Sequence, residues 1–578
     1  MRKQRDLCER YFSEPYIGEL VYLIAAKKRY KKFLQLVVMQ QNDSDGEEFP
    51  YVFVPTVDIL LMWLTHQSYP TIYAADTEHM ENELLLKVVG PWDHSVKEED
   101  IQKMKELWEA TFDQPYEKAG GMLAVDLQST VAVETPAYWV VSDVDVNVKY
   151  NSLHPRFLLE ACVFLRLRSH LDATQPEKTR EFLRLRVIRC HKELKLDIPI
   201  SRLTSDSWQK AWHLYSEFGT RGIKLELRHP GNLCFTGTGL LDTVSISWND
   251  LLRAPSLAYG TEADQKIRVF TSITPPVQAP YLLKCVPDRV TDDSGAMVSD
   301  VMLKLNHYRP QEGRWLSRTV LDHAGRECFV VRIRVGGGFW RRGGESPETV
   351  KWEDRIIEVR EGPWSYVASS TIGKAPDKVV GTAKPIEESK ETISWCFSTG
   401  DNLTVKLLKG RKMQYEVSKE ERKIRKLRKI EHQAGEDDDE YVTVVRTSDE
   451  NPNGKATALL NWKLLAVELS PEEDAVFVLL LCHAILRSVS EMRKEDVGGL
   501  LVRRRLKEVK LGDRDWGSVI VHPSSSSASS LTSPYIQPWY WNAKAVLGHD
   551  PGAEHTLNQP SFSLAEGGEK LYKRARGK

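Results

Sequence analysis

The sequence lacks any apolar run long enough to cross a bilayer. From Ala475 to Leu486 every residue except His483 is apolar, but as a helix this run would rise only about 18 Å, whereas a membrane span needs roughly 20 residues. The chain begins with MRKQRDLCERYF, which places charges where a secretory signal needs apolar residues. We therefore expect no targeting or transmembrane segment, and we expect the protein in the cytoplasm or the nucleus.

Closely spaced cysteines and catalytic motifs are also missing. The eight cysteines are never closer than 28 residues apart, which excludes CxxC metal and redox motifs, so we interpret them as reduced core thiols. There is no HExxH, no GxSxG and no kinase-like set. Cys190 and His191 are adjacent, but neighbouring strand residues point to opposite faces. The sequence thus predicts a non-enzymatic protein with no catalytic residues, no metal ligands, no cofactor and no identified small-molecule substrate.

An excess of charge of one sign is absent as well. The 578 residues include 80 basic and 81 acidic side chains, for a net charge of −1, so the field of the whole protein neither attracts nor repels nucleic acid. Any binding to a polyanion must come from local patches. Apolar residues make up 41% of the chain, which is enough for several domains, each with its own core. We therefore expect a multi-domain α+β protein.

Residues 1–150 are predicted to form a helical domain. Apolar residues recur at helical spacing from Ile17 to Leu34, with KKRYKK supplying the polar side. Pro55 opens a second helix, Tyr69-Pro70 interrupts it, and residues 97–112 supply a third. A metal site is an alternative for the side chains of this region, but we favour a packed, hydrogen-bonded core for them. They are Trp63, His66, Tyr73 and His79.

Residues 151–280 alternate apolar and polar side chains in short segments separated by turn residues. This pattern predicts an antiparallel β-sandwich. Its loop acids are scattered, which favours a sandwich that does not depend on calcium. The stretch ITPPVQAP, from Ile273 to Pro280, is predicted to be a stiff linker.

Residues 281–510 are predicted to be rich in strands and to contain a central helix, residues 471–492. Ser470, Pro471 and Glu473 form a capping-box pattern at its start. Because no face of this helix could meet water, strands must surround it. We therefore expect a C-terminal β-barrel or strongly curved sheet around a buried hydrophobic helix. Residues 511–578 are predicted to be a tail, rich in serine and proline and carrying aromatic residues.

Two exposed patches are candidate binding sites. The run GGGFWRRGG contains Phe339, Trp340, Arg341 and Arg342, where rings can stack on bases and guanidinium groups can contact phosphates. A glycine-rich hairpin tip whose rings pack on the sheet is the alternative. Arg503, Arg504 and Arg505 lie in a second basic run, which suits RNA phosphates or lipid head groups. An ordinary soluble surface explains this second run equally well.

Several segments together resemble the plant glycine-rich domain proteins. The resemblance covers nearly the whole chain and implies a helical N-terminal region, a C2-like sandwich and a family-specific C-terminal domain, with no catalytic residues. The segments are VPTVDILLMWLTHQSYPTIY, REFLRLRVIRCHKELKLDIPI, SDSWQKAWHLYSEFGTRG, WNDLLRAPSL, YRPQEGRWLSRTVLDHAGRECFVVRIRVGGGFWRRGG and SPYIQPWYWNAKAV.

The chain departs from the family pattern at three points. The family carries two copies of a Trp-His-x-His signature, whereas this chain has a single copy that reads Trp63-Leu64-Thr65-His66. We expect that an N-terminal portion is missing, because the chain begins near the second copy. The chain also ends at GGEKLYKRARGK without a glycine-rich tail.

The resemblance implies a role in plant growth, development, and hormone and abiotic-stress responses, and RNA binding has been proposed for some members of the family. We therefore predict an intracellular adaptor that binds a protein or RNA partner. The first alternative is a peripheral protein that binds anionic membrane phospholipids through a C2-like module and a tubby-like barrel. The second is an uncharacterised enzyme. These classes differ in whether RNA, anionic vesicles or a small molecule binds.

Overall fold

A computed structural model of the chain describes most of residues 12–479 and one short segment beyond them. The described residues are 12, 14–42, 53–77, 96–123, 146–168, 180–188, 196–230, 238–291, 297–299, 315–335, 355–361, 364–368, 379–388, 392–397, 401–408, 412–419, 441–447, 455–461, 466–476, 478–479 and 519–521. Helices and strands are both present among them, which confirms the mixed α+β class.

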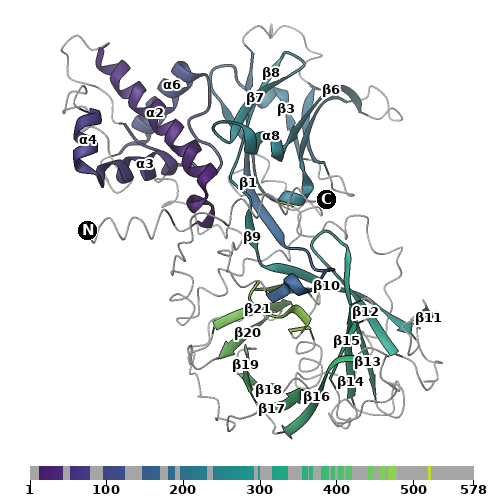
Figure 1. Cartoon of the computed structure of the whole chain (residues 1–578). Helices are drawn as coiled ribbons and strands as arrows, with labels where there is room; N and C mark the ends of the chain where they lie inside the picture. The colour runs from purple at the N-terminus through teal and green to yellow at the C-terminus, as the bar shows by residue number, and fades with distance from the viewer. Residues whose placement is uncertain are drawn as a thin grey trace.

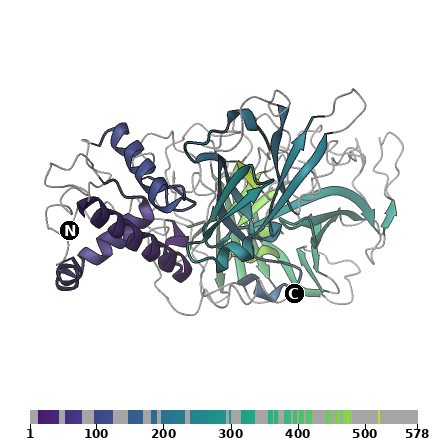
Figure 2. The ribbon, with the colours of Figure 1, turned by 90° about the horizontal axis from the view of Figure 1, so that it is seen from above.

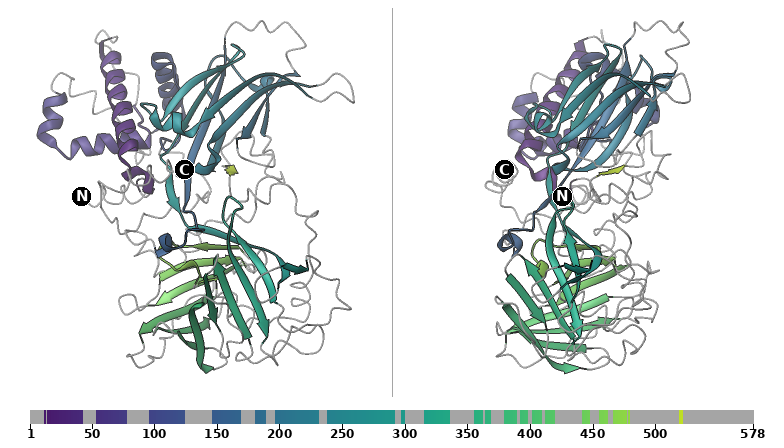
Figure 3. Two further views of the ribbon diagram at one scale, coloured as in Figure 1. Left: turned by 45° about the vertical axis from the view of Figure 1, so that its right-hand side comes forward. Right: turned by 90° about the vertical axis from the view of Figure 1, so that its right-hand side faces the viewer.

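Three regions are visible in Figure 1: a group of helices, a pair of packed sheets, and a large curved sheet below them. Seen from above, the helices lie to one side of the strands (Figure 2). Among the elements drawn as ribbons in Figure 3, a narrow bundle of strands runs between the packed sheets and the curved sheet. Within the described part of the chain, no helix combines the length and apolar character needed to span a membrane.

The helical region follows the sequence pattern closely. It comprises η1 (Pro15–Gly18), α2 (Leu20–Asn42), α3 (Val57–Gln67), α4 (Pro70–Thr77) and α6 (Glu98–Phe112), and the short η2 (Val146–Lys149) comes later in the chain. The predicted break at Tyr69-Pro70 is confirmed, since α3 ends before it and α4 begins at the proline. The helix predicted at residues 97–112 is confirmed as α6, and Asp100 caps its start by accepting from Lys97 N at 3.1 Å.

The buried face of α2 differs in part from the predicted one. Tyr30 and Phe33, predicted on the apolar side, are buried, but Leu20 and Ile24, also predicted there, are exposed. Arg29, within the predicted polar run, is buried. Arg29 lies inside because its Nε is 2.7 Å from Oδ2 of the fully buried Asp58, and its guanidinium carbon lies 5.1 Å from the centre of the Trp108 ring. An ion pair and a ring contact therefore override the simple apolar pattern.

Two antiparallel sheets pack face to face as a sandwich. One contains β4 (Gln209–Glu217), β1 (Arg156–Leu167), β8 (Ile267–Ile273) and β7 (Ala258–Ala263), in that order. The other contains β3 (Leu196–Pro199), β2 (Phe182–Val187), β5 (Gly222–His229) and β6 (Gly239–Ser247). Two 3₁₀ turns, η4 (Ile200–Arg202) and η5 (Phe218–Thr220), and helix α8 (Trp248–Arg253) connect strands. Alternate side chains of both sheets form one apolar core.

The prediction that residues Ile273 to Pro280 form a stiff linker is wrong, because this stretch is part of the folded sandwich. Val277–Ala279 forms strand β9, which pairs with the start of β1, and the whole stretch is buried. The prolines therefore do not mark a free spacer. They lie beside a short paired segment, since the neighbouring residues still supply backbone donors.

Among the described residues, thirteen strands form the curved sheet. β10 pairs with β22 through Tyr281–Lys284 and with β12 mainly through the residues after them, which bends the sheet strongly. Of the two predicted forms, the structure therefore has the strongly curved sheet and not a closed barrel. Its strands are β10 (Tyr281–Thr291), β11 (Met297–Ser299), β12 (Trp315–Leu321), β13 (Glu327–Val335), β14 (Arg355–Glu361), β15 (Trp364–Ala368), β16 (Val379–Glu388), β17 (Thr392–Phe397), β18 (Asp401–Leu408), β19 (Lys412–Lys419), β20 (Tyr441–Thr447), β21 (Lys455–Asn461) and β22 (Ala466–Leu469).

The predicted central helix begins later than its capping box indicated. The first helical residue is Ala475, and the side-chain hydroxyl of Ser470, the predicted cap, accepts a long bond from Glu472 N, at 3.4 Å. Asp474 accepts from Val476 N at 3.1 Å instead. The described helical side chains at 475, 476, 478 and 479 are buried, and the rest of residues 471–492 lies outside the described ones.

A distant asparagine completes this helix start. Asn147 donates to Pro471 O at 3.0 Å and to Glu473 O at 2.7 Å, and its side-chain oxygen accepts from Ala475 N at 3.0 Å. Lys149 and Tyr150 both contact Asp474. The segment before the sandwich is thus anchored on the curved-sheet region, which explains why a local capping pattern failed to locate the helix start.

Candidate functional site

Neither predicted binding patch lies among the described residues. Phe339, Trp340, Arg341 and Arg342 follow β13, and Arg503, Arg504 and Arg505 follow the start of the central helix. Both assignments stay predictions. Within the described residues, two other groupings of side chains could carry chemistry: a buried cluster on β1 and β4, and a charged group on the outer face of β2 and β5.

The buried cluster arises from the register of two antiparallel strands. Glu160 and Cys162 are two residues apart on β1, so they lie on the same face, while Leu159, Ala161 and Val163 belong to the sandwich core. His213 on β4 is the Cα partner of Cys162. The three side chains therefore meet on the face of the sheet that is turned away from the sandwich core.

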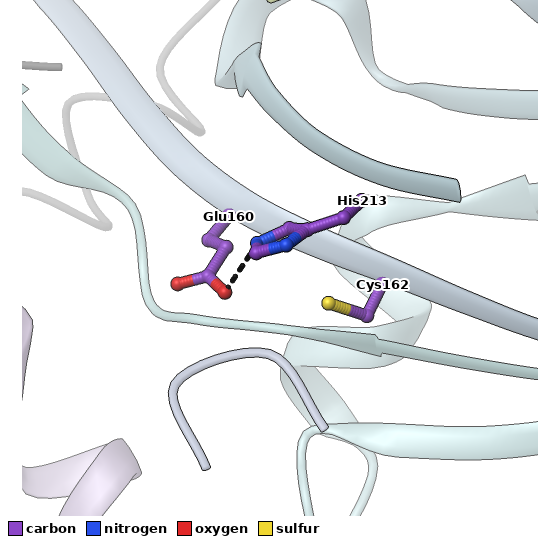
Figure 4. Close-up of side chains that lie close together, drawn as sticks. All are labelled: Glu160, Cys162 and His213. Atoms are coloured by element: carbon purple, nitrogen blue, oxygen red, sulfur yellow. Dashed lines mark hydrogen bonds and ion pairs between the residues drawn. The ribbon is translucent and has the colours of Figure 1, made fainter. Parts of the chain in front are cut away.

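Figure 4 shows the imidazole of His213 between the carboxylate of Glu160 and the thiol of Cys162. His213 Nε2 lies 2.7 Å from Glu160 Oε1. One ligand atom from each of the three residues lies within 4.8 Å of the other two, and all three residues are buried. The Tyr215 ring flanks the imidazole, with ring centres 5.7 Å apart.

A segment of the helical region covers this face of the sheet. Ala119 N donates to Ser272 Oγ at 2.9 Å, and Ala119 packs with Cys162 in one apolar cluster. Gly120 has a φ of 66°, and a Cβ there would lie 2.8 Å from Thr274 Cγ2. Only glycine therefore lets the segment approach so closely.

The cluster does not suit nucleophilic catalysis. Burial, reinforced by the charge of Glu160, raises the pKa of the Cys162 thiol well above its ordinary value. The thiol consequently stays protonated at neutral pH, whereas a cysteine nucleophile needs a lowered pKa and access to a substrate. What the three side chains offer instead is a set of sulfur, nitrogen and oxygen atoms close together.

The wide spacing of the cysteines predicts a core thiol at Cys162 and does not connect it with Glu160 or His213. No local motif joins them, because His213 lies on a separate strand and meets Cys162 only through strand pairing. The Glu-x-Cys spacing on a strand is the one available signal, since it places two ligand-type side chains on one face.

The second grouping lies on the outer face of the four-stranded sheet. Glu226 on β5 is buried, and three cations surround its carboxylate. Arg186 Nη1 lies 2.5 Å from Oε1, Arg228 Nη2 lies 2.7 Å from Oε2, and Lys224 Nζ lies 4.0 Å from Oε1. Burial would raise the pKa of Glu226, but hydrogen bonds from Arg186 and Arg228 outweigh it and hold that pKa below its ordinary value. Three positive charges around one carboxylate leave a local excess of two.

Apolar side chains border this basic group. Leu240 on the edge strand β6 is the Cα partner of Arg228, and Leu240 and Leu241 are 54% and 48% exposed. The register shifts between Leu227 and Arg228, so a bulge lies at this end of the sheet. Exposed leucines beside a cationic face form an amphipathic surface.

The histidine noted in the helical region is hydrogen-bonded. His66 Nδ1 lies 3.0 Å from Tyr30 Oη, and His66 Nε2 lies 3.3 Å from Asp76 Oδ2. Trp63 donates to Tyr73 Oη at 3.3 Å. This geometry agrees with the packed, hydrogen-bonded interpretation of these side chains. His79 lies outside the described residues.

Comparison with known families connects both ends of the described region to one group of proteins. The family model of the Glycine Rich Domain Protein C-terminal domain matches residues 320–406 and 402–469, which cover most of the curved sheet. The family model described as Glycine-rich domain-containing protein-like matches residues 1–76, which include α2 and α3.

Two curated relatives come from Arabidopsis thaliana. Glycine-rich domain-containing protein 1 is 24% identical over 537 residues, which cover 82% of this chain and 58% of the relative. Glycine-rich domain-containing protein 2 is 23% identical over 491 residues, which cover 79% of this chain and 56% of the relative. The chain therefore spans a little over half the length of the relatives that it matches.

Proposed function

Because the chain is a member of the plant glycine-rich domain protein family, we propose that it is a non-enzymatic adaptor in plant growth and abiotic-stress responses. We further propose that it binds RNA through the outer face of the four-stranded sheet, in addition to the predicted surface at residues 339–342. The observation that carries this proposal is the group of three cations held around Glu226.

The geometry of this group supports binding to a phosphate backbone. Glu226 is buried, so it orients Arg186 and Arg228 while remaining largely out of reach of a partner. Phe182 is the Cα partner of Arg228 on the neighbouring strand and offers a ring next to the cations. Positive charge with a neighbouring ring is what single-stranded nucleic acid requires, since phosphates pair with the charges and bases stack on the ring.

A salt titration of RNA binding tests the proposal. The full chain would be titrated with fluorescent single-stranded RNA at several salt concentrations, alongside a variant carrying Arg186→Gln, Lys224→Gln and Arg228→Gln. If all three cations contact phosphates, the slope of log affinity against log salt becomes about two units less steep, at roughly 0.7 per contact.

The matched control changes three exposed lysines of α2, through Lys27→Gln, Lys28→Gln and Lys31→Gln. This control removes the same charge from another face and is expected to leave the slope within a few tenths of the original. Equal slopes for the original protein and the β2/β5 variant would contradict RNA binding at this face.

A peripheral phospholipid-binding protein is the second candidate, and the exposed Leu240 and Leu241 favour it. Leucines beside a basic face can insert at the boundary between head groups and acyl chains while the cations pair with anionic lipids. This arrangement fits the C2-like interpretation of the sandwich, in a form that does not use calcium.

Vesicle flotation separates the two candidates. With vesicles containing phosphatidylserine at physiological salt, Leu240→Ser with Leu241→Ser is expected to abolish flotation if lipid is the partner and to leave RNA binding unchanged. Leu20→Ser with Ile24→Ser removes exposed apolar side chains elsewhere and is the control. If the original protein does not float, the lipid candidate is wrong.

A further inference from the structure

The cluster on β1 and β4 unites three chemically different metal ligands on a rigid support. Glu160 O accepts from Thr274 N at 2.9 Å, and Glu160 N donates to Thr274 Oγ1 at 2.9 Å. Cys162 pairs with His213 on one side and with Ser272 on the other. All three side chains therefore project from paired strands rather than from a loop, which fixes their spacing.

The three side chains need to move only slightly for their ligand atoms to surround an ion. The ligand atoms lie within 4.8 Å of one another. In a tetrahedral zinc site the ligand atoms stand roughly 3.3–3.8 Å apart, as bond lengths of about 2.0–2.3 Å dictate. Side-chain rotations that shift the atoms by about 1 Å or less, opening the 2.7 Å contact between Glu160 Oε1 and His213 Nε2 and drawing the more distant atoms in, would therefore complete the coordination with the backbone in place.

The ligand types select the class of metal. Sulfur and imidazole nitrogen favour zinc and related transition ions, whereas calcium and magnesium prefer sites made of oxygen alone. The charges of the ligands also suit a divalent ion. A divalent ion with one thiolate, one carboxylate and a neutral imidazole has no net charge, and a neutral group is the form that a buried site holds at the lowest cost.

We propose that Glu160, Cys162 and His213 form a zinc-binding site that clamps β1 to β4 beneath the segment containing Ala119. The ion takes the place of the Glu160–His213 hydrogen bond and binds the oxygen, sulfur and nitrogen atoms, and one coordination position is left for water. Binding releases the thiol proton of Cys162 to solvent, since the thiolate is the metal ligand.

This clamp is structural. The three residues are buried, and the segment carrying Ala119 and Gly120 covers the same face of the sheet. The ion would stabilise the sheet against which the helical region packs. Zinc is therefore expected to raise the melting temperature of the protein, and a chelator is expected to lower it.

Metal analysis of the full chain, purified without a histidine tag, tests the proposal. After incubation with zinc and dialysis, the protein is expected to retain about one equivalent of zinc by mass spectrometry. Cys162→Ser is expected to reduce the retained zinc at least tenfold, because loss of even an outer-shell partner of a metal site typically costs about 10–100-fold in affinity. Cys328→Ser also changes a buried thiol, but on β13, and it is expected to retain the metal.

Titration of the original protein with cobalt(II) is a test that does not depend on whether any variant folds. Cobalt bound to a thiolate gives an intense charge-transfer absorption in the near ultraviolet, and the original protein is expected to develop it on titration. Zinc should displace the cobalt and remove the absorption. Glu160→Gln and His213→Gln are expected to weaken cobalt binding at least tenfold.

Two outcomes would overturn the proposal. One is that the original protein, after loading, retains less than about one tenth of an equivalent of zinc and shows no cobalt–thiolate absorption. The other is that Cys162→Ser and Cys328→Ser bind metal equally well, which would place the ion elsewhere. Circular dichroism of both serine variants establishes that the compared proteins are folded.

Discussion

The β-sandwich contacts its two neighbouring regions in different ways. Towards the helices, partly exposed groups form ion pairs: Asp113 at the end of α6 pairs with Arg166 and Arg268. Towards the curved sheet, the contact is formed by a buried arginine and two buried carboxylates. Arg156 is fully buried, with its Nε 2.6 Å from Glu217 Oε1 and its Nη1 3.0 Å from Glu468 Oε1.

This difference determines how each contact should respond to mutation. Exposed ion pairs are screened by water and contribute little each. A buried pair depends on all its members, because removing one leaves a charge without compensation. The buried ion pairs with the curved sheet should therefore be sensitive to mutation, whereas the partly exposed ion pairs with the helices should tolerate it.

Arg156→Met is expected to have the largest effect. It leaves Glu217 and Glu468 buried without their cation and should lower the free energy of unfolding by about 3–5 kcal/mol. Burial raises the pKa of both carboxyls to about 7, even though Arg156 opposes the shift. The loss should therefore be larger at pH 8 than at pH 5.5, where both carboxyls are neutral.

Urea denaturation at the two pH values measures this effect. Adding Glu217→Gln and Glu468→Gln to Arg156→Met should restore part of the stability at pH 8. A loss below about 1 kcal/mol at pH 8 would show that the buried contact is not more sensitive than an exposed one.

Asn147→Ala should have the next largest effect. The change removes two bonds to carbonyls and one from Ala475 N, which should cost about 2–3 kcal/mol because buried backbone groups lose their partners. Hydrogen exchange of residues 470–479 should accelerate markedly. Ser152→Ala, which removes a hydroxyl bond to Glu361 at 2.7 Å, is the milder comparison, and equal exchange in both variants would contradict the assigned role of Asn147.

Glu109→Gln probes the contact with the helices through pH. Burial raises the pKa of Glu109 from 4.5 to about 7, although its bond from Trp208 N and the charge of Arg166 oppose the shift. Between these two pH values the folded protein holds a proton that the unfolded chain releases, so the free energy of unfolding falls as pH rises.

Glutamine does not titrate, so this part of the pH dependence should disappear in the variant. At pH 8 the free energy of unfolding of Glu109→Gln is expected to exceed that of the original protein by about 1 kcal/mol. The difference is small because Glu109 is only half-buried and water screens its charge. Thermal unfolding from pH 4.5 to pH 8 measures the slope. An unchanged slope in Glu109→Gln would show that another group titrates in this range.

Asp113→Asn should have the smallest effect. Asparagine tolerates the left-handed conformation at this position, where φ is 53°, so only the charge is lost. The expected change in the free energy of unfolding is below about 1 kcal/mol and should vanish in 1 M salt. If the change in the free energy of unfolding persists in high salt, Asp113 behaves as a buried charge and not as an exposed one.

Local patterns in the sequence predict much of the secondary structure. The alternating run QKAWHLYSE forms β4, and the proline after Tyr69 starts α4. These predictions depend on residues near one another in the chain. The capping box at Ser470 failed because Asn147, more than 300 residues away, forms the decisive bonds at the helix start.

The candidate sites were harder to predict for the same reason. Cys162 meets His213 through strand register, and Arg156 meets Glu468 across 312 residues. Neither pairing leaves a motif in the sequence. The predicted patches at residues 339–342 and 503–505 were selected by composition, and they lie outside the described residues.

A short strand from the predicted tail also joins the sandwich. β23 (Val519–Val521) pairs antiparallel with β4, with Val519 opposite Ser216 and Val521 opposite Leu214, and it is visible as the yellow strand in Figure 3. The curved sheet thus lies, in chain order, between two segments of the same sandwich sheet. A truncated version ending before Val519 would leave backbone N–H and C=O groups of β4 unpaired. An exposed edge strand of this kind can pair with the same strand of another copy, so the truncated protein should self-associate.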